Sequence, residues 1–356
     1  MWIDTDNEAW VWTEQDAWDD AGNIQGPAGA DGQDAESPAR VIWVADDGTG
    51  DFALLSAALA SITDASATKP YVIKIAPGVY TETATVALKD YVDVEGSGQG
   101  VTTIECACSS NETAPKKHLA AVVQAGAQDG LTGVGVIAEI RHLTISNTGG
   151  EGNDYSYGLY IEGPASNNPA KLFSVLHVTA TADGTQSSPA ATVASTGVVI
   201  ASRATPQLNY VTATASYSPG TTIGVDIMGA SEVVMNNVTA TGAFGVNTYG
   251  VQSSGLSEVV MDNVTATART DSPFAGNGRG FNNADFSTAT ILNSTLTGYT
   301  YSIYNVRAEG EGVGAEAQIA NTTLDGDASG NSGLKCAAVR DENFAPLDDT
   351  CLDEGN

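Results

Sequence analysis

Polar and aromatic residues recur at one position of a repeated four-residue block in the second half of the chain. The first copy is Tyr157–Tyr160 and the last is Tyr301–Tyr304, and the two middle residues of each copy are small and then apolar. A carboxylate or amide at the last position can hydrogen-bond sugar hydroxyls, and a tyrosine can offer its ring face to a sugar. We therefore predict carbohydrate binding at these last positions. The candidates are Tyr160, Asp226, Gln252, Asn282 and Tyr304.

Catalysis on a polysaccharide sets stricter demands than binding. Glycoside hydrolysis uses two carboxylates, about 5–5.5 Å apart for retention and about 6.5–9.5 Å apart for inversion. Asp226 is the only acid among the last positions of the block, and Glu232 and Glu258 fall in expected turns. A lyase would need a Ca²⁺ site and a basic residue, for which Arg279 and Arg307 are the candidates. We assign no catalytic residue, no metal ligand and no cofactor, and calcium stays an unsupported alternative.

The fold that would position these residues is indicated by a second repeated block, which starts at Leu143 and continues at Val178, Val211, Val238 and Val264. Its copies, mostly Val-Thr-Ala-Thr, are 26 to 35 residues apart. Two or three short strands in such a step are typical of a parallel β-helix, whose turns stack ~4.8 Å apart. A propeller blade needs about 40–45 residues. The sequence predicts an all-β protein, a right-handed parallel β-helix, over residues 40–335.

Alternation along the strands predicts which residues of the second block face outward. The valines and alanines point into the coil, so the intervening threonines form an outer row. The row consists of Thr144, Thr179, Thr212, Thr239, Thr265, Thr295 and Thr323. Rows of threonine spaced ~4.8 Å between turns and ~6.7 Å along a strand resemble the ice-binding faces of β-helical antifreeze proteins. Threonine also favours strands for steric reasons alone, so both interpretations stay open.

An asparagine precedes the second block in four of its copies, and we predict that these side chains stack as a structural ladder at a bend. The ladder consists of Asn237, Asn263, Asn293 and Asn321. His142 and His177 occupy the same position in earlier copies. We therefore interpret the two histidines as ladder members and not as metal ligands.

The ends of the chain differ from the repeats. Residues 1–25 are acidic and rich in tryptophan, and we predict an attachment or stem segment there. Residues 26–39 have glycine at every third position from Gly26 to Gly32, which predicts a collagen-like linker and, if chains wind together, a homotrimer. Residues 336–356 are predicted to close the coil through a Cys336–Cys351 disulfide, which implies an extracellular setting. Free thiols are the alternative, and the redox state of Cys106 and Cys108 stays open.

The charge balance restricts the partners. Forty-three acidic residues against 14 Lys and Arg give a formal net charge of −29. Such a surface repels phosphate backbones and anionic lipid, so we expect no nucleic-acid partner and no membrane partner.

The first turns carry a resemblance to a known family. The segment Val44–Phe52, a short helix over Phe52–Ile62, then Ile75–Glu82 and Val94–Gly98, resembles the opening of pectin methylesterases and related pectate-lyase-like β-helices. In that family the helix caps the N-terminal end of the coil, so the resemblance implies a capping helix here. The family's Gln-Asp-Thr-Leu, Asp-Phe-Ile-Phe-Gly and Leu-Gly-Arg-Pro-Trp boxes are absent. Their absence favours a non-enzymatic function and a structural role for Glu82.

A second resemblance concerns the stalk and the later repeats. The run Gly22–Gly32 is similar to stalk segments of tailed-virus tail fibres and bacterial surface fibres, and residues 170–351 look like the repeat-rich β-helices that follow such stalks. This resemblance implies a trimeric tail-fibre or tailspike subunit, on a virion tail or cell surface, that recognises host cell-surface polysaccharide. Its N-terminus would attach to other virion or fibre proteins. The alternatives are a polysaccharide-degrading lyase or glycoside hydrolase on the same β-helix, and a cell-surface adhesin or ice-binding protein.

Overall fold

The computed structural model divides the chain into two units, residues 1–39 and 40–356. It describes residues 2–3, 8–12, 18–23, 39–108, 119–126, 135–149, 155–164, 172–184, 194–218, 220–269, 276–305, 315–330, 333–343, 345–348 and 350–351. The first unit holds an antiparallel sheet of β1 (Trp2–Ile3), β2 (Glu8–Trp12) and β3 (Trp18–Asn23). The collagen-like linker predicted at residues 26–39 lies outside the described residues apart from Ala39. Its role and that of the stem segment stay predictions.

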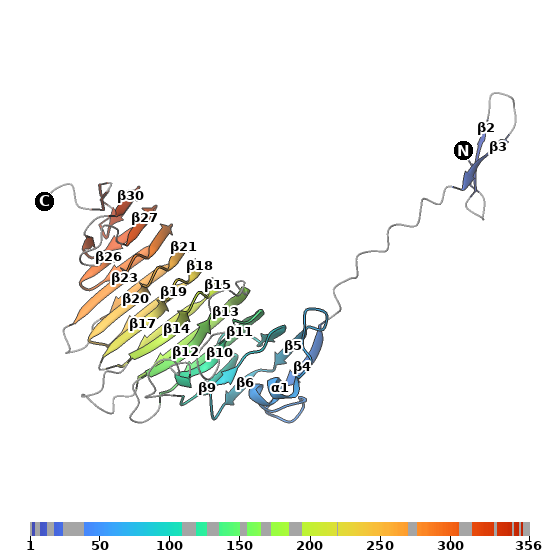
Figure 1. Ribbon diagram of the computed structural model, residues 1–356, viewed down its shortest axis with the longest axis horizontal. Coiled ribbons are helices and arrows are strands. Elements are labelled where there is room, and N and C mark those ends of the chain that lie inside the picture. The colour runs from blue at the N-terminus through green and yellow to red at the C-terminus, as the bar shows by residue number, and fades with distance from the viewer. Residues whose placement is uncertain are drawn as a thin grey trace. The chain divides into compact units, whose positions relative to one another are not determined.

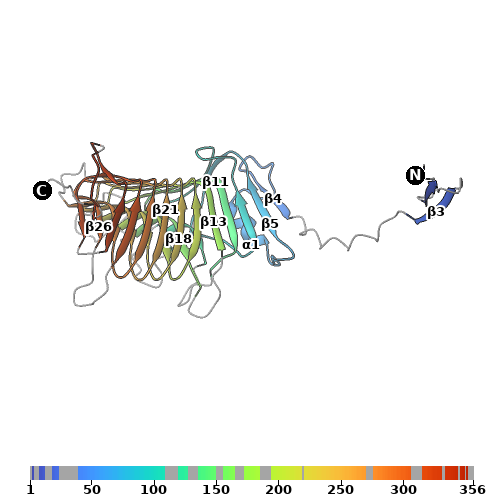
Figure 2. The same ribbon diagram turned by 90° about the horizontal axis from the view of Figure 1, so that it is seen from above.

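The second unit is a coil of parallel strands, as Figures 1 and 2 show. One wall, here called the nine-stranded sheet, receives one strand from each turn. Its strands in sequence order are β7 (Val86–Ala87), β10 (Ala121–Ala125), β12 (Tyr155–Glu162), β14 (Ala194–Ala201), β17 (Thr221–Ile227), β20 (Asn247–Ser253), β23 (Asn277–Asn283), β26 (Tyr301–Asn305) and β29 (Ala328–Gly330). The parallel β-helix predicted from the repeats is confirmed.

The remaining wall, here called the bent sheet, bends within most turns and so usually receives two strands from each. Its strands are β4 (Arg40–Val44), β5 (Tyr71–Ile75), β6 (Gly78–Thr81), β8 (Val92–Glu95), β9 (Thr102–Cys106), β11 (Ala138–Asn147), β13 (Leu172–Asp183), β15 (Thr205–Asn209), β16 (Thr212–Ser216), β18 (Glu232–Asn236), β19 (Thr239–Ala243), β21 (Glu258–Asp262), β22 (Thr265–Arg269), β24 (Thr288–Leu292), β25 (Thr295–Gly298), β27 (Glu316–Ala320), β28 (Thr323–Asp325), β30 (Leu334–Ala337) and β31 (Arg340–Asp341). Each strand pairs in register with the equivalent strand of the next turn. The repeated blocks therefore stack directly on one another.

The core is a set of apolar columns, one residue per turn. On the nine-stranded sheet the column is fully buried and consists of Leu159, Val198, Val225, Val251, Phe281 and Ile303. A glycine precedes five of these residues, and the glycine column faces the bent sheet at very short range. At Gly224 an added Cβ would lie 2.5 Å from the backbone nitrogen of Thr241. Only glycine lets the two walls approach this closely, because any side chain there would overlap backbone.

The bend of the bent sheet explains the asparagine ladder. Asn237, Asn263, Asn293 and Asn321 all have positive φ, between 49° and 55°, a conformation that asparagine tolerates better than most residues. Asn263 Nδ2 donates to Asn237 Oδ1 at 2.6 Å, whereas Asn293 Nδ2 donates to Asp262 Oδ1 at 2.8 Å.

Earlier turns place rings at the same bend. His142, His177 and Tyr210 also have positive φ, and their rings stack with centroids 5.1 and 4.7 Å apart.

The helix α1 (Leu55–Ser61) lies beside β4 and β5 at the N-terminal end of the coil (Figure 1). It is shorter than predicted because Phe52 instead forms a bridge with Val44. The buried Glu82 carboxylate accepts hydrogen bonds from the backbone N–H of Ser56 at 3.0 Å and from its hydroxyl at 2.6 Å. Glu82 thus satisfies an N–H of the first helical turn, which is a structural role. The capping function of the helix stays a prediction.

Two disulfides are present. The predicted Cys336–Cys351 bond is confirmed, and Cys106 and Cys108 form the second. Among the described residues, no helix combines the length and the apolar character that crossing a membrane requires.

Candidate functional site

The outer face of the nine-stranded sheet brings the predicted sugar-binding residues together. The strand register places Tyr160, Val199, Asp226, Gln252, Asn282 and Tyr304 on successive turns, and we call this column the outer file. Although these side chains point away from the core, several are covered. Asp226 and Asn282 are each 7% exposed and Tyr160 is 9% exposed. The outer file is therefore a partly desolvated set of polar groups and not an open solvent face.

A second outer column contains Arg279, which the sequence analysis considered only as the basic residue of a lyase, and tyrosines that it did not select as site residues. It occupies the first position of the same block, with Tyr157, Tyr249, Arg279 and Tyr301 among its members. Tyr157 packs beside Tyr160 with ring centroids 6.0 Å apart. The tyrosines at this position of the block were the signal that could have identified the column.

Hydrogen bonds connect the polar residues of the outer file. Gln252 Nε2 donates to Asp226 Oδ1 at 3.2 Å, and Asn282 Nδ2 donates to Gln252 Oε1 at 3.4 Å. Arg279 Nη1 donates to Asn282 Oδ1 at 2.7 Å. The guanidinium carbon of Arg279 lies 3.7 Å from the ring centroid of Tyr304. A continuous chain of polar contacts therefore runs from a carboxylate to a guanidinium across neighbouring strands.

Three tyrosines of this face, Tyr157, Tyr160 and Tyr249, have raised pKa values. Burial raises the pKa of Tyr157 and that of Tyr160, and the negative charge of Asp226 adds to both shifts. The pKa of Tyr249 is also raised, mainly by burial, although the nearby positive charge of Arg279 opposes the shift. Each of these three phenols therefore keeps its proton at neutral pH.

The other acidic candidates lie on the bent sheet. Glu232 and Glu258 are the first residues of the neighbouring strands β18 and β21, where they are paired in the strand register, and both are exposed. The expectation that they lie in turns is therefore wrong. Each strand begins two residues after a residue with positive φ, Ala230 before β18 and Leu256 before β21. Arg307 lies outside the described residues. In the part of the chain that the structure describes, no group of three or more His, Cys, Asp or Glu is placed to hold a metal ion.

A cluster of charged residues at the start of the bent sheet is a network of ion pairs. Arg141 donates to Glu95 at 2.9 Å and also to Glu139, and Lys74 lies 3.5 Å from Glu95. Burial alone would raise the pKa of Glu95, but Arg141 and Lys74 hold it below its usual value. Burial raises the pKa of Asp93. Mutual pairing accounts for these groups, so they are not assigned to the site.

The predicted threonine row is found on the outer face of the bent sheet. Thr144, Thr179, Thr212, Thr239, Thr265, Thr295 and Thr323 are neighbours in the strand register. Thr239 and Thr265 are exposed. Ice binding by this row stays a prediction.

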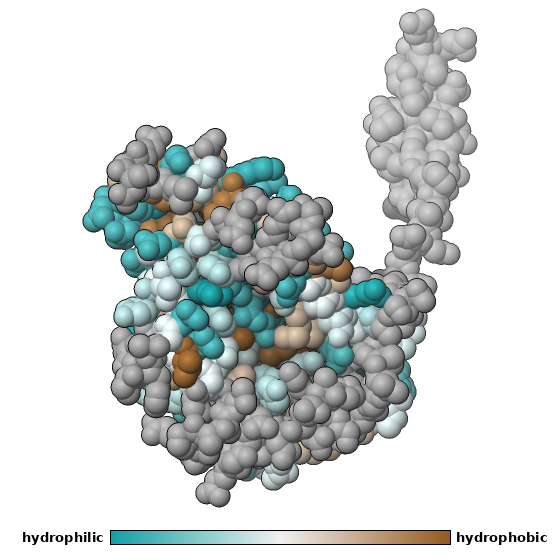
Figure 3. Space-filling view, turned by 60° about the vertical axis from the view of Figure 1, so that its left-hand side comes forward, coloured by the Kyte–Doolittle hydropathy of each residue, from teal (hydrophilic) through white to brown (hydrophobic). Residues whose placement is uncertain are grey.

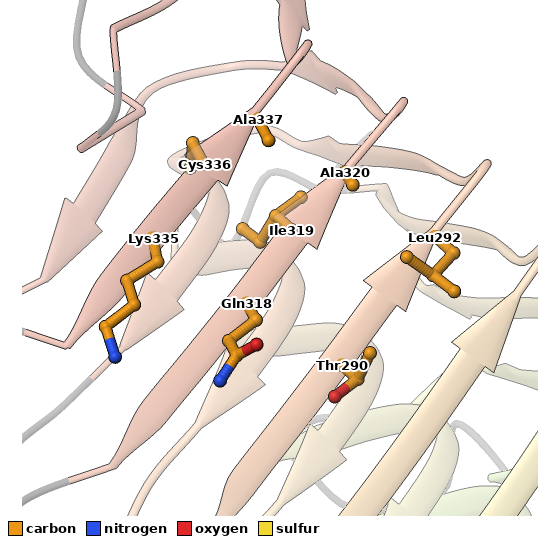
Figure 4. Close-up of a pocket in the computed structure, with 8 residues that line it drawn as sticks. All are labelled: Thr290, Leu292, Gln318, Ile319, Ala320, Lys335, Cys336 and Ala337. Carbon is orange, nitrogen blue, oxygen red and sulfur yellow. The ribbon is translucent and has the colours of Figure 1, made fainter.

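A cavity of about 240 Å³ lies at the C-terminal end of the bent sheet. Thr290, Gln318 and Lys335 from three adjacent strands line it, together with apolar side chains (Figure 4). No carboxylate is among its described lining residues, so it offers no counterpart of the buried Asp226. We therefore take the outer file, and not this cavity, as the candidate site.

The face of the molecule seen in Figure 3 mixes hydrophobic with hydrophilic residues.

Comparisons with known proteins agree with the fold. The pectinesterase family model matches residues 41–167, and no curated protein matches. Pectate lyase Pel9A has a TM-score of 0.54 at 15% identity and is aligned over 89% of this chain and 82% of its own. Pectin methylesterase from carrot gives 0.49 at 14% identity over 86% and 89%, and PemA from Erwinia chrysanthemi gives 0.45 at 14% identity over 88% and 92%. The chain has a β-helix of the pectinesterase and pectate-lyase type.

The predicted structural tail-fibre or tailspike subunit is contradicted. The family model that matches residues 41–167 is that of an enzyme, pectinesterase. The enzyme alternative fits better. The resemblance of residues 22–32 to fibre stalks rested on three glycine triplets, too short a run to identify a fibre. An extracellular location agrees with the two disulfides. The homotrimer stays a prediction.

Proposed function

We propose that this pectinesterase-like β-helix hydrolyses carboxylic esters of an extracellular polysaccharide of the pectin type. The observation that carries the proposal is the carboxylate of Asp226, which is largely buried and tied through Gln252 and Asn282 to Arg279. The family match over residues 41–167 and the pectin methylesterases among the similar structures support the choice of substrate.

Ester hydrolysis fits the composition of the outer file. Asp226 takes a proton from a water molecule as the water oxygen attacks the ester carbonyl carbon. The second N–H of the Gln252 amide donates to the oxyanion that forms, because only one of its two N–H groups is used for Asp226. The intermediate then collapses, the bond to the alcohol oxygen breaks, and the proton held by Asp226 passes to the leaving alkoxide. The products are a carboxylic acid and an alcohol.

Glycoside hydrolysis fits the site less well, because the outer file presents a single carboxylate where that reaction uses two. The net charge of −29 also favours an esterified polymer, whose acid groups are masked, over a fully ionised one. The same charge would help to release the ionised product.

The proposal is tested by incubating the purified chain with methyl-esterified pectin and measuring methanol. We expect release by the wild type and a loss of about 10²–10⁴-fold in Asp226→Asn, the range for removing a general base. Glu258→Gln, an exposed carboxylate on the opposite wall, is the matched control and should keep full activity. Unsaturated sugars would indicate a lyase and new reducing ends a glycoside hydrolase. Either product without methanol overturns the proposal, as does a folded but inactive wild type.

A further inference from the structure

The cavity at the C-terminal end of the bent sheet contains a cation that no acid of the described chain neutralises. Lys335 lines the cavity and is exposed, and within the described residues its ammonium forms no ion pair. The chain has 43 acidic and 14 basic residues, yet no carboxylate is among the described lining residues. An anion that enters the cavity therefore meets one positive charge and no negative one.

The other described lysines give the internal contrast, because each has a partner in the protein. Lys69 and Lys74 pair with carboxylates. Lys89 Nζ donates to two backbone carbonyls at the end of α1, at 2.6 and 2.7 Å. Lys335 differs from all three, since the three N–H donors of its ammonium remain available to a group from outside the protein.

Two neutral polar side chains extend this cation into a row. Thr290, Gln318 and Lys335 are neighbours in the register of β24, β27 and β30, so they follow one another at ~4.8 Å. Their polar ends lie in one line across the three strands (Figure 4). Within the described residues, neither the Thr290 hydroxyl nor the Gln318 amide has a hydrogen-bond partner. An apolar row on the same three strands borders them: Leu292, Ala320 and Ala337.

This combination of groups fits one unit of an acidic sugar. A hydroxyl and an amide exchange hydrogen bonds with sugar hydroxyls, and an ammonium binds a carboxylate. Small apolar side chains can pack against the C–H groups of the ring. The volume of about 240 Å³ is below the ~300–1,000 Å³ of sites that enclose drug-sized ligands, so the cavity accommodates a single sugar and not an oligomer.

We propose that Thr290, Gln318 and Lys335 bind one uronate unit of the polysaccharide and attach the enzyme to its polymer away from the outer file; the identity of the polymer rests on the proposed function. The cavity belongs to the bent sheet and the outer file to the nine-stranded sheet, so the two engage different units of the polymer. A second attachment point raises the effective concentration of esters near Asp226. It lowers the KM for long chains and leaves the chemical step unchanged.

Protection of lysine from acetylation tests the site without reference to activity. The folded chain is treated with a limiting amount of an acetylating reagent, with and without unesterified oligogalacturonate, and peptide mass spectrometry follows each lysine. We expect the oligosaccharide to slow acetylation of Lys335 at least about threefold, because an ammonium bound to a carboxylate is not free to react. Lys74, already paired with Glu95, is the internal control and should not change. Equal acetylation of Lys335 under both conditions overturns the inference.

Kinetics then separate attachment from chemistry. Methanol release is measured on long, partly esterified pectin and on short esterified oligomers. Lys335→Gln should raise the KM for the long polymer about threefold, within the range of an exposed ion pair, and leave kcat and the rates on short oligomers unchanged. Arg269→Gln removes an exposed positive charge at the end of β22 and is the matched control. An unchanged KM in Lys335→Gln, or an equal loss on short oligomers, contradicts an attachment site.

Charge variants sharpen the result. Lys335→Arg keeps the charge and should keep most of the affinity. Glu316 faces outward two residues before Gln318, so Glu316→Gln removes a like charge and should lower the KM for the long polymer. Protection of Lys335 in a wild type that releases no methanol supports the cavity and refutes the esterase proposal. Methanol release without that protection has the opposite meaning.

Discussion

The outer face of the nine-stranded sheet and the outer face of the bent sheet lie on the same coil, yet they differ in burial. On the nine-stranded sheet Tyr157, Tyr160 and Asp226 are 5%, 9% and 7% exposed. On the bent sheet Thr239 and Thr265 stand in an equally regular row but face solvent. Regular stacking of repeats therefore determines which side chains are neighbours. It does not determine whether their row is a site, a second core or a solvated wall.

The sharpest difference between the two faces is expected in stability. Tyr157→Ala removes a buried ring that contacts Tyr155 and Tyr160, and by comparison with other buried aromatic truncations it should lower the free energy of unfolding by about 3 kcal/mol or more. Thr265→Ala on the solvated row should change it by less than about 0.5 kcal/mol. Urea unfolding of both variants measures the contrast. Equal losses would show that the two faces are equally buried.

Tyr157 of the nine-stranded sheet should also make stability fall at high pH. Burial raises the pKa of Tyr157 in the folded chain above its value in the unfolded chain. The unfolded state therefore loses its proton first, and the stability present below pH ~10 decreases as the pH rises further, by up to about 1.4 kcal/mol per pH unit for each such group.

Tyr157→Phe has no phenol to ionise at this position, so its urea midpoint should fall less than that of the wild type between pH 10 and 11. Parallel alkaline curves for the two proteins would contradict a buried phenol.

A smaller effect is expected at the bend of the bent sheet. Asn263→Ala places alanine at a φ of 55° and removes the hydrogen bond to Asn237 Oδ1, which should cost about 1–2 kcal/mol. Asn263→Gly keeps the conformation accessible and loses only the side-chain contact. Thermal unfolding should rank wild type, glycine and alanine in that order. If alanine were as stable as wild type, the ladder would have no stabilising role.

The sequence predicted the coil because its information is local and repeated. Alternation places Val225 inside and Asp226 outside, and the repeat aligns Thr212, Thr239 and Thr265. The Cys336–Cys351 bond followed from two cysteines in one short closing segment.

Other features depended on long-range contacts and were missed. Phe52 pairs with Val44 and leaves the helix, and Arg279 acquires its surroundings from Tyr249 and Tyr304, one turn away on either side. The sequence analysis selected only one of the two outer columns and expected it to face solvent, because the burial of an outer face depends on the assembled turns. The opening segments already resembled pectin methylesterases, but the short catalytic boxes were absent, and the sequence analysis therefore favoured a non-enzymatic function that the match over residues 41–167 contradicts.

The glycine column has a consequence for how such a molecule can change in length. Successive turns contact mainly their neighbours, so a complete turn can be gained or lost without remodelling distant parts. A turn inserted between those of Gly197, Gly224 and Gly250 must nevertheless supply a residue without a side chain at this position, or the two walls would be forced apart there. At the two ends of the column Val122 and Ser302 occupy the position instead. Copying or deleting one full repeat, such as the 26 residues from Val238 to Asn263, satisfies this requirement automatically, whereas an insertion of arbitrary length does not.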